Sequence, residues 1–230
     1  MGEFFENSVF FGVFVSLFSY GIGVLLKKKW NLPIFNPLLI SIVLTMLALL
    51  TFHVDYAIYQ EGARFISYLL TPATVCLAIP LYEQFDLLKK NCRAVLLGIA
   101  SGVLTSLCTV LILSLLLQLD HSAYVTLLPK SITTAIGMGI SEELGGYVSI
   151  TVAVIIVTGM LGNIFAETVC RIFKITDPIA KGVAIGTASH AVGTAKAMEM
   201  GEVEGAMSSL SIVVSGLLTV VGAGLFAPLL

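Results

Sequence analysis

Two polar stretches of a very apolar chain carry the residues whose types and spacing could do chemistry. The first is LLPKSITTAIGMGISEELGG, residues 127–146, and the second is KGVAIGTASHAVGTAKAMEMGEVEGAM, residues 181–207. Each stretch places serine and threonine hydroxyls beside glycine and lysine. An interrupted helix leaves backbone N–H groups free at its new N-terminus, and those groups attract an anion. The pattern therefore predicts binding of a small carboxylate.

The candidate binding residues each offer a hydroxyl, a positive charge or a glycine backbone at one of these interruptions. They are Lys130, Ser131, Thr133, Thr134, Ser189, His190, Gly193, Thr194 and Lys196. His190 titrates near neutrality, so it is either a proton carrier or a fixed hydrogen-bond donor. Glu167 is the second candidate for proton coupling, and it could instead pair with a cation.

Each of these residues also has a purely structural interpretation. Serine and threonine often join membrane helices to one another, and a lysine side chain can extend to the lipid headgroups. The clustering of such residues in both stretches favours a function. An ionisable residue at membrane depth is expensive to keep there, which makes it a functional hypothesis by default.

Other kinds of site are not indicated. Three scattered histidines form no metal-ligand pattern. Ser189 and His190 are neighbours, so on a helix their side chains point about 100° apart, and no G-x-S-x-G motif surrounds them. The formal net charge of −2 gives no reason to expect nucleic-acid binding. The sequence therefore predicts no enzyme activity, no metal and no cofactor.

The elements that must position these residues are membrane helices. The chain is 57% hydrophobic and 11% charged, with a mean hydropathy of +1.02, whereas soluble domains carry about a quarter charged residues. The acidic start, MGEFFENSVF, lacks a basic segment, so we expect the first apolar run to remain as a transmembrane helix. Apolar runs long enough to cross a bilayer predict about six full spans. They lie at 8–26, 34–52, 63–81, 94–117, 149–170 and 206–229.

Basic loops orient these spans, because lysine and arginine concentrate on the cytoplasmic side. The basic residues at 27–29, 89–93 and 171–181 predict three cytoplasmic loops and an N-terminus outside. The run 149–170 must then pass from outside to inside, so residues 122–148 must begin and end outside. We predict a re-entrant hairpin there; the alternative is a further full span that breaks the charge rule.

A weak internal repeat agrees with this topology. The motifs SGVLT, TGMLG and SGLLT begin at Ser101, Thr158 and Ser215, at equal spacing. A broken segment followed by a span occurs at 122–170 and again, in the opposite orientation, at 182–229. The fold class we predict is an all-α polytopic membrane protein with an inverted repeat of the kind found in secondary transporters. Residues 1–121 would form scaffold-like N-terminal helices, and residues 122–230 a core with two broken segments.

The stretches LPKSITTAI and GTASHAVGTAKAMEMGEVEGAMSSL resemble the LrgB/CidB family of bacterial membrane proteins, most specifically from Leu128 onward. The resemblance implies a bacterial cytoplasmic membrane and two possible functions. Members are commonly called antiholin-like or holin-like proteins, tied to control of murein hydrolases and lysis, and they accompany a small LrgA/CidA-type membrane partner. Relatives in chloroplasts are glycolate/glycerate translocators, and some bacterial pairs are linked to pyruvate uptake.

The residues favour transport, because a pore-former or its antagonist needs no combination of lysine and hydroxyls in two broken helices. We expect alternating-access transport of a small monocarboxylate of the pyruvate, glycolate or glycerate type. The expected surroundings are the lipid bilayer, and the expected assembly is a homo-oligomer. The alternative is an antiholin- or holin-like regulator of murein hydrolase activity and lysis that acts with the LrgA/CidA-type partner.

Overall fold

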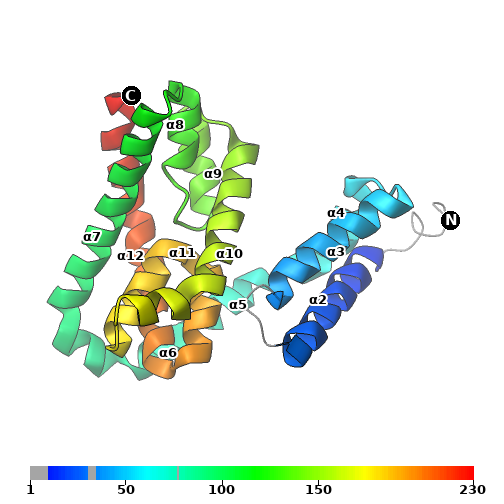
Figure 1. The fold of residues 1–230 in the computed structure, drawn as a ribbon, viewed down its shortest axis with the longest axis horizontal. Coiled ribbons are helices and arrows are strands. Elements are labelled where there is room, and N and C mark those ends of the chain that lie inside the picture. Colours follow the sequence, from blue (N-terminus) through cyan, green and yellow to red (C-terminus); the bar gives the residue numbers. More distant parts are fainter. Residues whose placement is uncertain (1–9, 31–34, 77) are drawn as a thin grey trace. The chain divides into compact units, whose positions relative to one another are not determined.

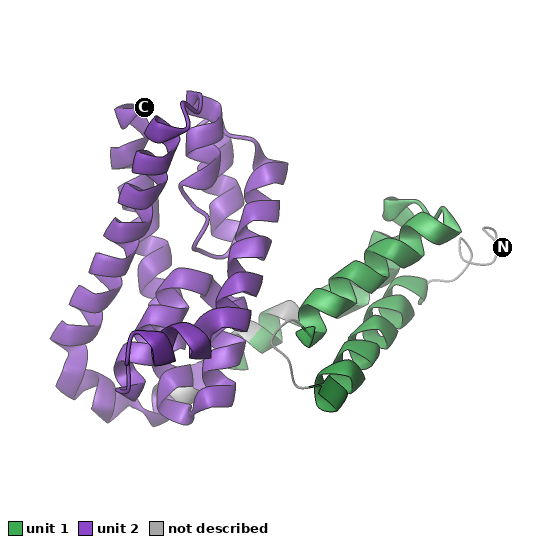
Figure 2. Ribbon diagram, viewed as in Figure 1, with its two compact units in different colours: residues 1–76 green, residues 77–230 purple. Residues whose placement is uncertain are grey.

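The fold is helical throughout the part of the chain that the structure describes. The computed structural model describes residues 10–30, 35–76 and 78–230, and every regular element among them is a helix (Figure 1). They form two compact units, residues 1–76 and residues 77–230 (Figure 2). The boundary between the compact units therefore lies after Cys76, while the functional division predicted at 121/122 stays a prediction.

The first unit contains α2 (Phe11–Trp30), α3 (Pro37–Phe52), α4 (Tyr56–Ser67) and α5 (Leu70–Cys76). Helix α3 begins where the Asn36 side chain accepts a hydrogen bond of 2.9 Å from the Leu38 N–H group, the usual way of satisfying a free helix N-terminus. Gly23 lets α2 approach the start of α3 closely, since a Cβ at Gly23 would lie 2.7 Å from the Pro37 carbonyl oxygen.

The single span predicted at 63–81 is not present as one helix. The chain there is divided among α4, α5 and α6 (Ala78–Glu83). Pro72 and Pro80 each lie in the first turn of a new helix. Proline has no N–H group and fits the first turn of a helix better than its interior, which accounts for the new starts.

In the second unit, α11 and α12 pack on α7 and on each other, and α10 packs on α11 (Figure 1). Its elements after α6 are α7 (Phe85–Leu116), α8 (His121–Leu127), α9 (Thr134–Glu143), α10 (Val148–Ile172), α11 (Pro178–Met200), α12 (Glu202–Phe226) and the short 3₁₀ helix η2 (Ala227–Leu229). Every fourth residue of α7 is buried, namely Val95, Ile99, Val103 and Leu107. This stripe faces a core to which α8, α11 and α12 contribute.

A first hairpin connects α7 to α10. Helix α8 runs inward from the C-terminal end of α7, the chain turns at residues 128–133, and α9 returns (Figure 1). The return is fixed by Thr126 of α8, whose Oγ1 accepts a hydrogen bond of 2.7 Å from the Tyr147 N–H group. Residues 121–147 thus begin and end at one end of the unit, in agreement with the turn predicted within 122–148.

A second hairpin lies within α11, at Ser189 and His190. Their φ/ψ angles are −139°/20° and 42°/−143°, which are not helical. The first arm (residues 178–188) precedes this break and lies along α7. A Cβ at Gly98 would contact Val183, and a Cβ at Gly102, one turn later, would contact Thr187, one turn after Val183. The first arm therefore runs parallel to α7.

After the break, the second arm (residues 191–200) follows α10 instead. Asn163 contacts Val192 through a hydrogen bond of 2.8 Å, and Glu167, one turn later, contacts Lys196. The second arm therefore runs parallel to α10. Because the first hairpin joins the end of α7 to the start of α10, those two helices run in opposite directions, and the two arms of α11 do the same.

The surface of the long helices is apolar where it is exposed. Four described helical segments are long and apolar enough to cross a membrane: Phe11–Trp30, Phe85–Leu116, Val148–Ile172 and Glu202–Leu229. Leu97 and Leu116 of α7 are 71% and 72% exposed, and Leu225 of α12 is 68% exposed. Exposed leucine in such amounts suits hydrocarbon surroundings and not water. The count of six full spans is not confirmed.

Candidate functional site

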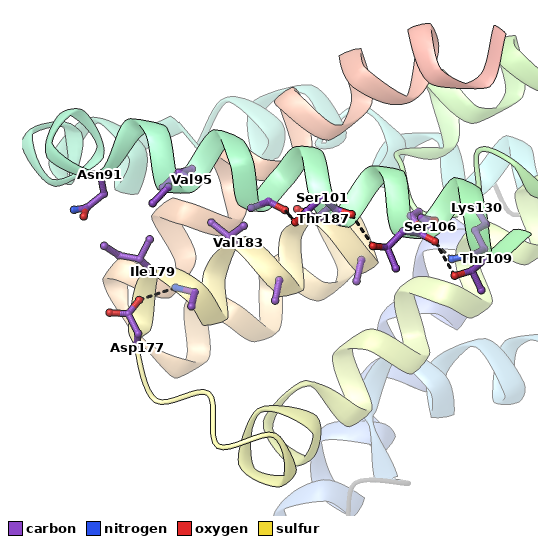
Figure 3. Close-up of a pocket in the computed structure, with 18 residues that line it drawn as sticks. Asn91, Val95, Ser101, Ser106, Thr109, Lys130, Asp177, Ile179, Val183 and Thr187 are labelled. Carbon is purple, nitrogen blue, oxygen red and sulfur yellow. Dashed lines mark hydrogen bonds between the residues drawn. The ribbon is translucent and has the colours of Figure 1, made fainter. Parts of the chain in front are cut away.

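A cavity of about 710 Å³ lies between α7, the first arm of α11 and the tip of the first hairpin. Figure 3 shows Asn91 and Asp177 at one end of this cavity, and Thr109 and Lys130 at the other. The wall between the ends is mostly apolar, with Val183 as one of its members. The cavity lies entirely within the second unit, and it has a polar group set at each end.

The tip of the first hairpin brings Lys130 and Ser131 to the cavity. The Lys130 Nζ donates to Ser131 Oγ over 3.0 Å, and Ser131 Oγ lies 3.0 Å from Ser106 Oγ of α7. The neighbouring Leu128 and Pro129 are buried, which anchors the turn. Among the residues that the structure describes, no carboxylate lies within ion-pair distance of Lys130. A partly buried ammonium group without a counter-ion is a natural partner for an anionic ligand.

Three hydroxyl groups of α7 face the same cavity from successive turns. Ser101 Oγ donates to the Gly98 carbonyl at 2.8 Å, and Thr105 Oγ1 donates to the Ser101 carbonyl at 2.7 Å. Thr109 Oγ1 donates to the Thr105 carbonyl at 2.7 Å. Each hydroxyl has spent its one hydrogen on the helix backbone, so toward the cavity it offers lone pairs only.

The residues of the second break pack inside the protein and do not line this cavity. His190 is 4% exposed, and its Nε2 lies 3.0 Å from the Ile155 carbonyl oxygen. A carbonyl can only accept, so this nitrogen carries the hydrogen. A Cβ at Gly159 would lie 2.7 Å from the imidazole Cε1, so α10 makes room for the ring only because it has glycine there.

The other predicted residues of the second break are engaged in the packing of its arms. Ser189 Oγ donates to the Ile185 carbonyl at 2.8 Å. Thr194 Oγ1 lies 2.7 Å from Ser208 Oγ of α12. Gly193 is buried next to Ser189, where a larger residue would collide. These contacts hold the break in place, and their role in ligand binding stays a prediction.

Lys196 is neutralised by carboxylates from its own and a neighbouring helix. Its Nζ lies 2.7 Å from Glu167 Oε1 of α10 and 3.2 Å from Glu199 Oε2. The lysine side chain is 18% exposed, and that of Glu167 is 60% exposed. From the sequence, Glu167 could either take part in proton coupling or pair with a cation, and in the structure it has a cation partner in Lys196.

Thr133 and Thr134 lie at the start of α9, directly after the tip of the first hairpin, and they do not line the cavity. Both are partly buried. Thr133 occupies the N-cap position, and its side chain makes no capping hydrogen bond. Of the nine predicted binding residues, the structure therefore places Lys130 and Ser131 on the cavity.

The hydroxyl groups that α7 and the first arm of α11 add to the cavity were not among the residues predicted from the sequence. They belong to Ser101, Thr105, Ser106, Thr109 and Thr187. The signal for α7 was present, because hydroxyls recur there every three or four residues, the spacing of one helix face. No such signal exists for Thr187, which reaches the cavity only through the packing of α11 on α7.

These helices and exposed apolar faces define a multi-pass helical membrane protein. The chain belongs to the LrgB-like family, whose model matches residues 16–229. It is 40% identical over 220 residues to Antiholin-like protein LrgB of Bacillus cereus (strain B4264), covering 95% of this chain and 96% of the relative. The same values hold for Antiholin-like protein LrgB of Bacillus anthracis (strain CDC 684 / NRRL 3495). No solved structure matches the chain.

Proposed function

We propose that this chain acts in the antiholin-like role for which its relatives are named, and that it does so by moving a small monocarboxylate across the membrane. The regulatory part is supported by 40% identity over 95% of the chain to proteins of that name. The transport part is supported by the cavity and by Lys130. The relatives' name supports regulation more directly than transport, and the two are compatible because export or uptake of an acidic metabolite can itself be a signal.

The observation that carries the transport part is Lys130, which lines a cavity of about 710 Å³ and has no carboxylate of the described residues within ion-pair distance. An ammonium group is costly to keep away from bulk water unless an opposite charge compensates it. Lys196 has two such partners, and Lys130 has none among the described residues. A carboxylate ligand would supply the missing charge.

The mechanism we propose is alternating access. The first hairpin with α10, and the second hairpin with α12, would be the two halves of an inverted repeat spanning residues 122–170 and 182–229. Each half would contribute one broken segment at mid-membrane depth, as secondary transporters with such repeats do. The basic residues of the second unit, apart from Lys130 and Lys196, lie at the end with Asn91 and Asp177, which we assign to the cytoplasm. The N-terminus would then lie outside.

The assembly we propose is a homo-oligomer in the bacterial cytoplasmic membrane, working with a small LrgA/CidA-type membrane protein. Proton coupling belongs to the same proposal; of its two candidates, His190 and Glu167, the hydrogen bond of His190 to the Ile155 carbonyl favours Glu167 as the carrier. Regulation of murein hydrolases would follow from the movement of the carboxylate and need no direct contact with the hydrolase.

The test measures both parts with one pair of variants, Lys130→Met and the matched Lys27→Met, whose lysine lies at the end of α2 in the first unit. Purified protein in proteoliposomes is assayed for uptake of radiolabelled glycolate and pyruvate. The same variants are assayed for control of lysis in a bacterial strain that lacks its own LrgB-type protein. We expect Lys130→Met to lose both activities and Lys27→Met to keep both. If wild-type protein controls lysis but takes up neither acid, the transport part is wrong. If Lys130→Met loses uptake and still controls lysis, the proposed link between the parts is wrong.

A further inference from the structure

Three cations lie close together near the start of α7, and none of them belongs to the cavity. Lys89, Lys90 and Arg93 are exposed, and they are not among the residues that line the cavity. No carboxylate of the described residues lies within ion-pair distance of any of the three, although Asp86 is one turn away on the same helix. This part of α7 therefore keeps an excess of positive charge at the protein surface.

The helix itself fixes the depth of these cations in a membrane. No charged residue follows Arg93 in α7, whose remaining residues are 94–116. At 1.5 Å per residue this segment is about 35 Å long, whereas the hydrocarbon core of a bilayer is about 30 Å thick. Lys89 and Arg93 therefore lie just outside the hydrocarbon, at the level of the lipid phosphates.

The cations share their face of α7 with exposed leucines. Lys89 and Arg93 are one turn apart, and Leu97 follows on the same face after one more turn. Leu97 and Leu104, two turns further along, are both exposed. The Lys89 Nζ lies 4.5 Å from the centroid of the Phe85 ring, and this cation–π contact holds the ammonium on that face. The face thus presents positive charge at the level of the headgroups and leucine at the level of the acyl chains.

That order of groups matches an anionic phospholipid. Arginine binds a phosphate through two parallel N–H groups, and lysine binds it as a point charge. The acyl chains of the same lipid would lie along the leucines. A zwitterionic lipid carries its own cation beside the phosphate, which competes with Lys89 and Arg93. A soluble anion would gain no contact with the apolar part of the face.

We propose that Lys89 and Arg93, with Lys90 beside them, bind the phosphate headgroup of an anionic phospholipid on the lipid-facing side of α7. These residues lie at the end of the unit with Asn91 and Asp177, which we assign to the cytoplasm. The cytoplasmic leaflet is the one whose anionic lipids attract basic segments next to membrane helices. The site is separate from the cavity, and the inference does not depend on the proposed transport.

The test measures lipid binding by purified full-length protein in a neutral detergent. The protein is titrated with dioleoyl-phosphatidylglycerol or dioleoyl-phosphatidylcholine, and native mass spectrometry counts the bound lipids. The variant is Lys89→Gln/Arg93→Gln. The matched control is Arg171→Gln/Lys174→Gln, which removes two exposed cations from the same end of the unit. Helix α10 ends at Ile172, so the two control cations do not share one helix face. Thermal unfolding of each variant establishes that it is folded.

We expect wild-type protein to bind phosphatidylglycerol at least tenfold more tightly than phosphatidylcholine. Each cation near the membrane surface contributes about fivefold to the affinity for anionic lipid. The variant Lys89→Gln/Arg93→Gln should therefore weaken the binding of phosphatidylglycerol about 20-fold and leave that of phosphatidylcholine unchanged. The control variant should weaken the binding of phosphatidylglycerol less than threefold. Inorganic phosphate, added at the concentration of the lipid, should not displace bound phosphatidylglycerol.

Three results would overturn the inference in different ways. Equal binding of the two lipids by wild-type protein would show that the surface does not recognise the charge of the headgroup. Equal losses in the α7 variant and in the control would show that the overall charge of this end attracts the lipid, and would remove the assignment to Lys89 and Arg93. Displacement of the lipid by inorganic phosphate would make the site one for a soluble anion.

Discussion

The two hairpins of the second unit carry the same residue types and use them differently. Each carries a lysine that the sequence predicts to bind the ligand, one in the turn itself and one in the arm after the break. Lys130 of the first hairpin reaches a cavity, where its Nζ donates a hydrogen bond to Ser131 Oγ. Lys196 of the second hairpin lies between two glutamates, 2.7 Å and 3.2 Å from its Nζ. The difference shows that a lysine in a polar membrane segment says little about ligand binding until its counter-ions are known.

The breaks themselves also differ. The first is a turn of six residues, 128–133, between two short helices. The second is a two-residue interruption in which His190 takes a φ of 42°, a conformation that costs a residue other than glycine about 1–3 kcal/mol. The hydrogen bonds of His190 and Val192 to α10 offset that cost. The first break presents side chains to a cavity, whereas the second is fastened to its neighbour.

The largest expected effect concerns the sides of the membrane from which the hairpins enter. Single cysteines replacing exposed residues of a cysteine-free chain are treated with a membrane-impermeant maleimide. His121 and Tyr147 bracket the first hairpin, and Phe173 and Glu202 bracket the second. We expect the first two positions to be labelled from one side only, and the last two from the opposite side only, because each hairpin starts and ends at one end of the unit. Labelling of positions 121 and 147 from opposite sides would turn the first hairpin into a full span and end the comparison.

The second prediction sets the two lysines against each other. Lys130→Met should weaken glycolate binding about 100-fold, since it removes the one lysine or arginine among the described residues that line the cavity, and such partly buried charge pairs are worth several kcal/mol. Lys196→Met should change binding less than threefold, and should instead lower the free energy of unfolding by about 1 kcal/mol through the loss of its pair with Glu167. Titration calorimetry and thermal unfolding of both variants provide the measurements. Equal losses of binding would place Lys196 in the site as well.

Much of the fold could be predicted from the sequence, because apolar runs and basic loops can be recognised from the residue types along the chain. The chain turns back between residues 121 and 147, as the position of the basic loop at 171–181 required. The glycines and polar residues around His190 likewise marked a segment that is interrupted. The predicted span at 63–81 was wrong as a single helix, since hydropathy does not distinguish one helix from three when prolines lie at the joints.

The contents of the site were less predictable, for reasons of packing. Whether Lys196 faces a ligand or Glu167 depends on how α11 is rotated and shifted against α10, and spacing within one segment does not determine that. Ser106 and Thr109 lie in an apolar run, where hydroxyls often serve only their own helix. They become candidates once the tip of the first hairpin is seen to contact Ser106.

The third prediction concerns His190 and the pH dependence of uptake. The buried imidazole is held to the Ile155 carbonyl and does not line the cavity, so we expect it to act as a fixed donor. His190→Gln keeps a donor at that place. Initial uptake of glycolate into proteoliposomes, measured from about pH 5.5 to 8 around the ordinary titration range of histidine, should follow parallel profiles in variant and wild type. A profile that becomes flat in His190→Gln would instead make this residue the proton carrier and give the second hairpin a direct part in transport.

The smallest expected effect is on the free energy of unfolding, and it is measured by replacing one buried threonine near each hairpin. Thr151 of α10 fastens the first hairpin, with its Oγ1 3.0 Å from the Thr126 carbonyl and 2.7 Å from Ser141 Oγ. Thr187, on the first arm of the second hairpin, is also buried, but its Oγ1 has no hydrogen-bond partner among the described residues. Replacement by valine keeps the shape and removes the hydroxyl.

Thr151→Val should therefore lower the free energy of unfolding by about 1–2 kcal/mol, because its partners lose a buried hydrogen bond. Thr187→Val should leave that free energy unchanged or raise it by up to about 1 kcal/mol, since an unpaired buried hydroxyl is itself unfavourable. Denaturation of both variants in the same detergent, without added carboxylate, measures the two effects. If Thr187→Val destabilises the protein as much as Thr151→Val, the Thr187 hydroxyl has a hydrogen-bond partner in the folded protein. A polar contact would then join the first arm of α11 to α7, as the contacts of Thr151 join α10 to the first hairpin.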